Sequence, residues 1–320
     1  MNRMIKIWLI VAGSLCAAGA LIFVTVMTAV GWDFSRLSTV KYETNEYGIT
    51  EDYDDVAITT DTADIEFVLS ADGKTEVVCY EAEKFKHSVS VKDGTLTVEP
   101  EGVRGWGDHI GIDFNTPKIT VYLPRAEYGS LTVKSDTGSV KMGNFFTLKS
   151  LDVTCGTGDA VCSVSVFDGA KIKCSTGDIT LEGCSVGSLS LAVSTGSISV
   201  SGVSCAGDAD VTVSTGRTKI EGLACKSFTS SGNTGDLSMK GVIASEAFDI
   251  KRTTGDVTFD GCDAADITVS TGTGDVTGTL CTSKVFTAKT GTGRVVLPDE
   301  RTGGACRITT STGNIIIVVE

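Results

Sequence analysis

The chain has 320 residues, with 37 glycines and four prolines, and it is 41% apolar but only 7% aromatic. This composition predicts a folded chain with many tight turns and a core of Val, Ile, Leu, Ala and Thr. The formal charge of −13 argues against a nucleic-acid partner, because phosphates repel an acidic surface. It also disfavours electrostatic docking onto anionic lipids.

The first predicted element is a transmembrane helix over residues 7–30. This run carries no charge and exceeds the about 20 residues that cross the hydrocarbon layer. Arg3 and Lys6 precede it, which favours a cytoplasmic N-terminus, and Trp8 and Trp32 lie at its two ends as interfacial residues do. A cleaved signal peptide is the alternative, but the apolar run is longer than the usual core of about 7–15 residues and no A-x-A site follows. We therefore expect a single-pass membrane protein in which residues 1–36 form a cytoplasmic stub and signal anchor, with the remainder extracellular.

Residues 37–129 predict an irregular β region that caps the membrane-proximal end of a repetitive C-terminal region. Asp93-Gly94 lies between two alternating runs, which is a strong hairpin signal. A second candidate hairpin runs through Ala71-Asp72-Gly73, and Thr62-Ala63-Asp64-Ile65 is a degenerate copy of the C-terminal repeat.

Residues 130–320 contain this repeat, whose most constant part is the pair Thr-Gly. Successive copies lie 19 or 20 residues apart, with the threonine at Thr137, Thr157, Thr176, Thr195, Thr215, Thr234, Thr254, Thr273, Thr292 and Thr312. Apolar residues alternate with polar ones on both sides of each pair, as in Leu189-x-Leu191-x-Val193, which is typical of half-buried strands. Gly in the pair can take a positive φ, so the pair predicts a turn.

Stacking of such units buries their apolar faces continuously. The repeat therefore predicts an all-β fold, a parallel β-solenoid or β-helix of about ten rungs, forming a rod of roughly 45–50 Å at about 4.8 Å per strand. A β-propeller is the alternative, but its blades need about 40 residues each, twice this period.

The Thr-Gly-Asp-Ile/Val turns, the juxtamembrane Gly31-Trp32-Asp33-Phe34-Ser35 and the segment Asp108-His109-Ile110-Gly111-Ile112 resemble the bacterial putative-adhesin family. This is a β-strand-repeat domain of unknown function, common in Gram-positive bacteria. The resemblance implies an envelope location, a repetitive β fold and no known catalytic residues, and some members are similar to proteins encoded beside envelope-stress systems.

Residues 183–187 match the G-x-S-x-G motif around a nucleophilic serine. That motif needs a strand-to-helix turn and a histidine that follows the serine in the chain. Here His87 and His109 both precede Ser185, so we interpret Ser185 as a turn residue and predict no catalytic site and no cofactor.

The aspartates Asp236, Asp256 and Asp275 follow successive Thr-Gly pairs, so a solenoid would stack them about 5 Å apart. Calcium could relieve their repulsion. The alternative is that each aspartate caps its own turn and that Arg217 and Arg294, immediately below and above the triplet, balance its charge; we favour this alternative.

The eleven cysteines are scattered singly, which favours buried thiols over a disulfide framework. Cys155 and Cys174 each lie two residues before a Thr-Gly pair, so they are expected to stack inside the solenoid on adjacent rungs.

A loop with Arg104, Trp106 and His109 between glycines is a candidate surface contact for a sugar or a headgroup. The alternative is that Trp106 packs against its own hairpin.

The leading functional hypothesis is a non-enzymatic, membrane-anchored scaffold, adhesin or envelope-stress accessory protein that contacts an envelope protein or cell-wall glycan. A carbohydrate-active enzyme or glycan-binding module on a parallel β-helix is the alternative, although the uniform period leaves no insertions to build a site. Ice binding would need a flat threonine face, whereas these threonines lie at corners. The last strand, Ile315–Val319, has no obvious cap, so we expect it to self-associate or to be covered by a partner.

Overall fold

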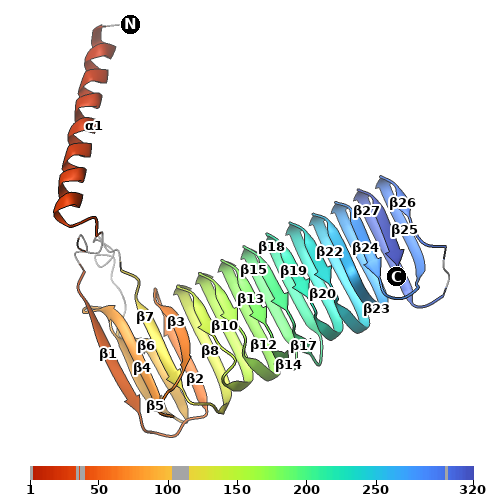
Figure 1. The fold of residues 1–320 in the computed structure, drawn as a ribbon, viewed down its shortest axis with the longest axis horizontal. Helices are drawn as coiled ribbons and strands as arrows, with labels where there is room; N and C mark the ends of the chain where they lie inside the picture. Colours follow the sequence, from red (N-terminus) through yellow and green to blue (C-terminus); the bar gives the residue numbers. More distant parts are fainter. Residues whose placement is uncertain (1–2, 34–35, 37–39, 103–114, 300–301) are drawn as a thin grey trace.

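The computed structural model describes residues 3–33, 36, 40–102, 115–299 and 302–320. Helix α1 (Arg3–Ala29) has 27 residues, a mean hydropathy of 2.4 in its most apolar window and no residue of that window buried. Since an α-helix rises about 1.5 Å per residue, α1 is long enough to cross a membrane. It projects from one end of a long β rod (Figure 1).

The rod consists of two facing sheets, and the chain passes from one to the other at each corner. The first sheet contains, in spatial order, β1 (Tyr42–Ile49), β4 (Thr75–Ala82), β7 (Lys118–Leu123), β3 (Asp64–Leu69), β9 (Val140–Met142), β11 (Ala160–Cys162), β13 (Ile179–Glu182), β16 (Ile198–Ser201), β19 (Thr218–Glu221), β21 (Leu237–Lys240), the first part of β23 (Val257–Thr273), β24 (Val276–Leu280), β28 (Ile315–Val319) and β26 (Val295–Val296).

The second sheet contains, in the same direction, β5 (His87–Lys92), β6 (Thr95–Pro100), β2 (Asp55–Thr60), β8 (Glu127–Thr137), β10 (Thr147–Thr157), β12 (Ser165–Thr176), β15 (Leu189–Thr195), β18 (Ala209–Thr215), β20 (Ala224–Thr234), β22 (Ile243–Thr254), the second part of β23, β27 (Ala305–Thr312) and β25 (Val285–Thr292). Two short strands, β14 (Ser185–Val186) and β17 (Ser204–Cys205), extend it beside β12 and β20.

The predicted parallel β-solenoid is confirmed, and it has about nine turns. Strands of successive turns pair in parallel and in register, so that Thr157 lies opposite Thr176 and Cys155 opposite Cys174. Side chains alternate inward and outward along each strand, as the sequence pattern requires. The inward ones form a single apolar cluster that runs from the first turn to the last.

The corners explain why Thr-Gly is the most constant part of the repeat. The corner glycines have φ between +131° and +151°, a conformation that a side chain strongly disfavours. A Cβ on Gly177 would also overlap the backbone carbonyl oxygen of Gly158, the corner glycine one turn earlier. The same overlap recurs at each later corner glycine in the column. Stacking of the turns therefore requires glycine for two reasons: the positive φ and the lack of space for a Cβ.

The C-terminal end of the rod does not follow chain order. β27 pairs with β23 on one side and with β25 on the other, and β28 lies likewise between β24 and β26. The chain therefore builds its last turn, β25 and β26, and then returns to fill the turn beneath it (Figure 1). The expectation that Ile315–Val319 forms an uncapped terminal edge was wrong for Ile315 and Ile316, which β26 covers. Ile317–Val319 pair with β24, and self-association through this strand stays a prediction.

The N-terminal end of the rod is interleaved in a similar way. β2 and β3 pair with β8 and β9, so the hydrophobic core continues without a break across residue 130. The degenerate copy of the repeat is confirmed as a corner, since Ile65 pairs with Val140 and the carbonyl of Ala63 lies against Gly138. The boundary between the cap, residues 37–129, and the solenoid, residues 130–320, stays a prediction about folding units.

Of the two predicted hairpins in this region, one is confirmed and one was wrong. β5 and β6 pair antiparallel around Asp93-Gly94, and both turn residues have positive φ. Ala71-Asp72-Gly73 does connect two strands, β3 and β4, but β7 lies between them and pairs with both. A local turn signal cannot reveal a strand that arrives from about 40 residues further along the chain.

Two alanine substitutions in one turn separate the two demands on the corner glycine. Gly183, at the opposite corner, has φ +58° and open space where a Cβ would be, whereas Gly177 has φ +134° and the carbonyl of Gly158 against it. We expect Gly183→Ala to lower the free energy of unfolding by about 1 kcal/mol, the cost of a side chain in the left-handed backbone conformation. Gly177→Ala should cost more than about 3 kcal/mol, because backbone must also move. Urea midpoints of the full chain in detergent measure both, and equal losses would contradict the stacked-corner geometry.

Candidate functional site

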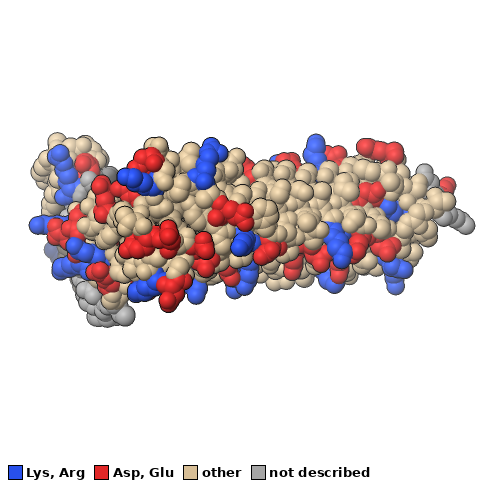
Figure 2. Space-filling model, turned by 90° about the horizontal axis from the view of Figure 1, so that it is seen from below, with Lys and Arg blue, Asp and Glu red and all other residues tan. Residues whose placement is uncertain are grey.

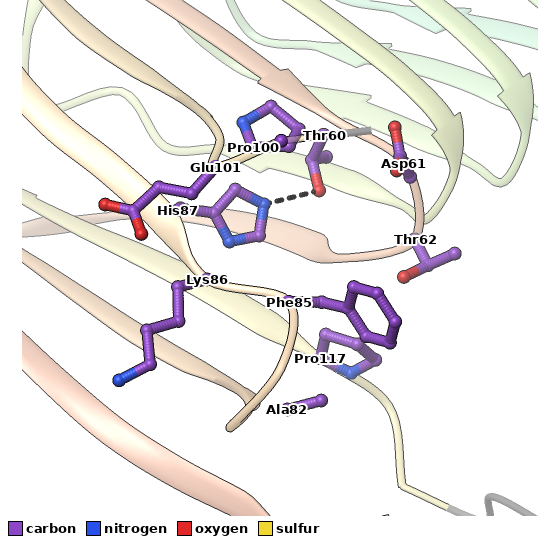
Figure 3. A pocket seen from close by; sticks show the side chains of 11 residues that line it. Thr60, Asp61, Thr62, Ala82, Phe85, Lys86, His87, Pro100, Glu101 and Pro117 are labelled. Atoms are coloured by element: carbon purple, nitrogen blue, oxygen red, sulfur yellow. Dashed lines mark hydrogen bonds between the residues drawn. The ribbon is translucent and has the colours of Figure 1, made fainter. Parts of the chain in front are cut away.

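A buried polar network joins the cap to the first turn of the solenoid. Glu81 lies near the end of β4, His87 begins β5 and Thr60 ends β2. The Nδ1 of His87 lies 2.7 Å from Oε2 of Glu81, and its Nε2 lies 3.0 Å from Oγ1 of Thr60. Figure 3 shows the imidazole ring directed at Thr60. A hydroxyl, an imidazole and a carboxylate in this order resemble the catalytic triad of hydrolases.

The surroundings of Thr60 make it a structural group and not a nucleophile. Thr60 and His87 are 2% and 6% exposed, and Oγ1 of Thr60 also accepts a hydrogen bond from the backbone N–H of Ala63 at 3.3 Å. The cavity beside them has a volume of about 20 Å³ and is lined by Phe85, Lys86 and Glu101 among others. That volume is about the room of one water molecule, too small for a sugar ring or a peptide.

The carboxylate of Glu81 is held from several sides. Besides His87 Nδ1, its Oε2 accepts the backbone N–H of His87 at 2.8 Å, and its Oε1 accepts Nδ2 of Asn45 at 2.8 Å. A carboxylate that is 1% exposed needs such partners, because burying an unpaired charge costs several kcal/mol. The network therefore ties β1, β4, β5 and β2 together.

Cys79 adds a thiol to this network. It lies two residues before Glu81 on the same face of β4, and the ligand atoms of Cys79, Glu81 and His87 all lie within 4.8 Å of one another. Burial, and secondarily the charge of Glu81, raises the pKa of the Cys79 thiol to about 12. Sequence reasoning missed this cluster, although alternation in residues 75–82 placed Cys79 and Glu81 on one face; nothing local indicated that His87 faces them.

The corner column carries the aspartates considered for calcium. Oδ1 of Asp236 accepts the backbone N–H of Asp256 at 3.0 Å, and Oδ1 of Asp256 accepts that of Asp275 at 2.8 Å. Each carboxylate thus bonds to the next turn, and the expectation that it caps its own turn was wrong in that respect. The next residue in the column is Asn314, whose N–H lies 2.7 Å from Oδ1 of Asp275.

The interleaved end also corrects the expected neighbours of the triplet. Arg217 precedes Asp236 in the column as predicted, but Asn314 separates Asp275 from Arg294, whose N–H bonds Oδ1 of Asn314 at 3.0 Å. Calcium at Asp236, Asp256 and Asp275 stays the less favoured alternative, since the hydrogen bonds hold the column without a metal.

The solenoid core also contains a buried cation. Arg252 is 5% exposed; its guanidinium bonds Oγ of Ser230 at 2.9 Å and Oγ1 of Thr218 at 3.3 Å, and burial lowers its pKa to about 10. Gly232 leaves the space that this guanidinium fills. Within the described residues, Nε of Arg252 has no hydrogen-bond partner. Two hydroxyl acceptors stabilise the charge only in part.

The remaining candidates of the sequence analysis fall into three groups. Arg104, Trp106 and His109 lie outside the described residues. Ser185 is exposed at the start of β14, and its N–H donates to Oγ of Ser165 at 3.1 Å, as a residue of a stacked turn does. The stacking of Cys155 and Cys174 on adjacent turns is confirmed, and both are buried free thiols.

The family of the chain follows from its sequence matches. Residues 53–216 and 206–320 match Toastrack DUF4097. Because these matches together cover most of the chain, the protein belongs to the Toastrack DUF4097 family, a domain of unknown function. The resemblance stated above is confirmed by this family match.

Several solved structures resemble the chain in fold. It is similar to a putative lipid binding protein of Parabacteroides distasonis ATCC 8503, at 19% identity and a TM-score of 0.52, over 75% of this chain and 98% of that one. It is also similar to a putative adhesin of the same strain, at 14% identity and 0.48 over 88% and 98%. A putative adhesin of Parabacteroides merdae ATCC 43184 matches at 15% and 0.49 over 74% and 96%. The first of these likenesses shows the fold alone. A search of curated proteins found no match.

Paired substitutions at Asp256 test the role of the corner column. Asp256→Ala removes the acceptor for the N–H of Asp275 and should cost about 1 kcal/mol, the net worth of one hydrogen bond. Asp256→Asn keeps an oxygen acceptor and removes one of three like charges, so its urea midpoint should equal or exceed that of the unsubstituted chain. If calcium is present and the urea midpoint of the asparagine variant falls as far as that of the alanine variant, but does not fall without calcium, the result would favour a metal in the column.

Proposed function

We propose that the protein is a non-enzymatic, membrane-anchored rod that presents its outer faces to other components of the cell envelope, as a scaffold or an adhesin. The observation that carries this proposal is the combination of one apolar helix with a long rod whose Thr-Gly corners recur every 19 or 20 residues from Thr137 to Thr312. In the proposed arrangement α1 is an uncleaved anchor with its N-terminus in the cytoplasm, and the rod is extracellular.

The shape of the rod supports a spacing or presenting role. At about 4.8 Å per turn the solenoid holds its distal turn, β25 and β26, roughly 45 Å from the cap. The column of corner hydrogen bonds and the continuous core oppose bending along this length. Most outward side chains are polar or charged, although Phe167 and Ile243 are also exposed. Acidic and basic groups are interspersed along the face seen in Figure 2. Such a surface suits polar contacts with proteins or glycans more than an apolar ligand.

Membership of a family that resembles putative adhesins supports the same reading. In the described residues the hydroxyl–imidazole–carboxylate arrangement at Thr60 is buried beside a cavity of about 20 Å³, which counts against the enzyme alternative. A glycan-binding module remains compatible with the rod, and the outer faces would then hold the glycan.

Protease accessibility in intact cells tests the proposed arrangement. The full chain should remain in the membrane fraction after an alkaline wash. External protease should digest the rod and leave a fragment that contains α1 and the residues before it. A control chain that lacks residues 3–29 should leave the membrane fraction. A rod that is digested only after cell lysis, or a mature protein that begins after residue 30, would contradict the anchored extracellular arrangement. Turnover of a polysaccharide or peptide by the purified protein would contradict the non-enzymatic role.

A further inference from the structure

The cap contains three buried side chains whose donor atoms converge from two sheets. Cys79 and Glu81 lie on the inward face of β4, and His87 begins β5 in the facing sheet. Their exposed fractions are 0%, 1% and 6%. The sulfur, a carboxylate oxygen and an imidazole nitrogen lie within 4.8 Å of one another, close enough for a single ion to reach all three.

The other polar atoms of these side chains already have separate partners. Thr60 Oγ1 lies 3.0 Å from His87 Nε2, opposite the nitrogen that faces Glu81. The Nδ2 of Asn45 donates to the second oxygen of Glu81 at 2.8 Å. Ligands of bound metals are oriented in this way, because the far ring nitrogen and the free carboxylate oxygen are each held by a neighbouring group.

We propose that Cys79, Glu81 and His87 bind one Zn²⁺ ion inside the cap. A thiolate and an imidazole together with a carboxylate suit zinc, whereas calcium and magnesium prefer oxygen ligands alone. On binding, the S–H bond of Cys79 breaks, its electron pair goes to the metal and its proton leaves to the buffer. His87 binds as the neutral tautomer that carries its proton on Nε2 and donates it to Thr60.

The charges of the occupied site balance. One thiolate and one carboxylate offset the two positive charges of the ion, so no net charge is buried, which is the arrangement that a low-dielectric site requires. Three protein ligands leave the fourth position of a tetrahedral zinc ion for a water molecule.

The site would fasten the cap to the solenoid. Cys79 and Glu81 belong to β4, which pairs with β1 and β7, and His87 belongs to β5, which reaches the first turn through β6. A metal between β4 and β5 therefore links the two sheets where the rod meets the membrane-proximal end. This inference is independent of the proposed function.

Metal content and cobalt spectroscopy of the full chain in detergent test the site. Protein stripped with a chelator and then dialysed against Zn²⁺ should retain one zinc per chain and melt at a higher temperature than the stripped protein. Cys79→Ser and His87→Gln should lose the retained zinc and the shift in melting temperature. Cys306→Ser removes another fully buried thiol, far along the rod. This control variant should keep both the retained zinc and the shift in melting temperature. Zinc retained by Cys79→Ser at the wild-type ratio, or no zinc retained by the wild type, overturns the proposal.

Cobalt gives a readout that does not depend on whether the variants fold. Co²⁺ added to the stripped wild-type chain should produce a thiolate-to-cobalt charge-transfer band with the intensity of one thiolate ligand. A cobalt spectrum without that band, or with the intensity of two or more thiolates, overturns the assignment of Cys79 as the single sulfur ligand.

Discussion

From Gly158 onward, the backbone of each corner glycine lies against the carbonyl oxygen of the corner glycine in the preceding turn. This close approach sets the geometry of the whole solenoid. The approach leaves no space for a Cβ: one built on Gly177 would overlap the carbonyl oxygen of Gly158. It also places the corner amides where they bond to the next turn, with Gly177 N–H donating to the carbonyl of Thr195 at 3.0 Å. Once the corners are fixed, the strands between them can pair only in register, and their inward side chains must stack in columns. The apolar core and the hydrogen-bonded aspartates are consequences of this constraint.

A rod built by stacking has two ends where strands would be left unpaired, and unpaired edges invite aggregation. At the distal end, insertion of β27 and β28 beneath β25 and β26 places the apolar strand Ile315–Val319 inside the rod instead of at its tip. At the other end the antiparallel strands β1, β4 and β5 close both sheets. The buried network of Glu81, His87 and Thr60 lies in this closure. It places a buried carboxylate and a buried imidazole where the repeat no longer dictates each residue.

The sequence was sufficient for the repeat and insufficient for its ends, for a physical reason. The spacing of Thr-Gly and the alternation around it report local backbone and burial, so the solenoid, the inward cysteines and the corner at Thr62-Ala63-Asp64 could all be predicted. The order of turns at the ends depends on pairing between distant segments. β7 enters between β3 and β4, and Asn314 enters between Asp275 and Arg294. The convergence of Cys79, Glu81 and His87 was missed for the same reason, because it forms only when two sheets face each other.

The stacked, interleaved corners can be tested directly by amide hydrogen exchange. In this structure Gly313 N–H donates to the carbonyl of Thr292 at 2.9 Å, whereas Gly293 N–H, in the last turn, meets no acceptor in the described part of the chain. The account therefore predicts slow exchange at Gly313, comparable with Gly274, and fast exchange at Gly293. A solenoid wound in simple chain order would give the reverse, with Gly293 protected and Gly313 exposed at the end, and that result would contradict the account.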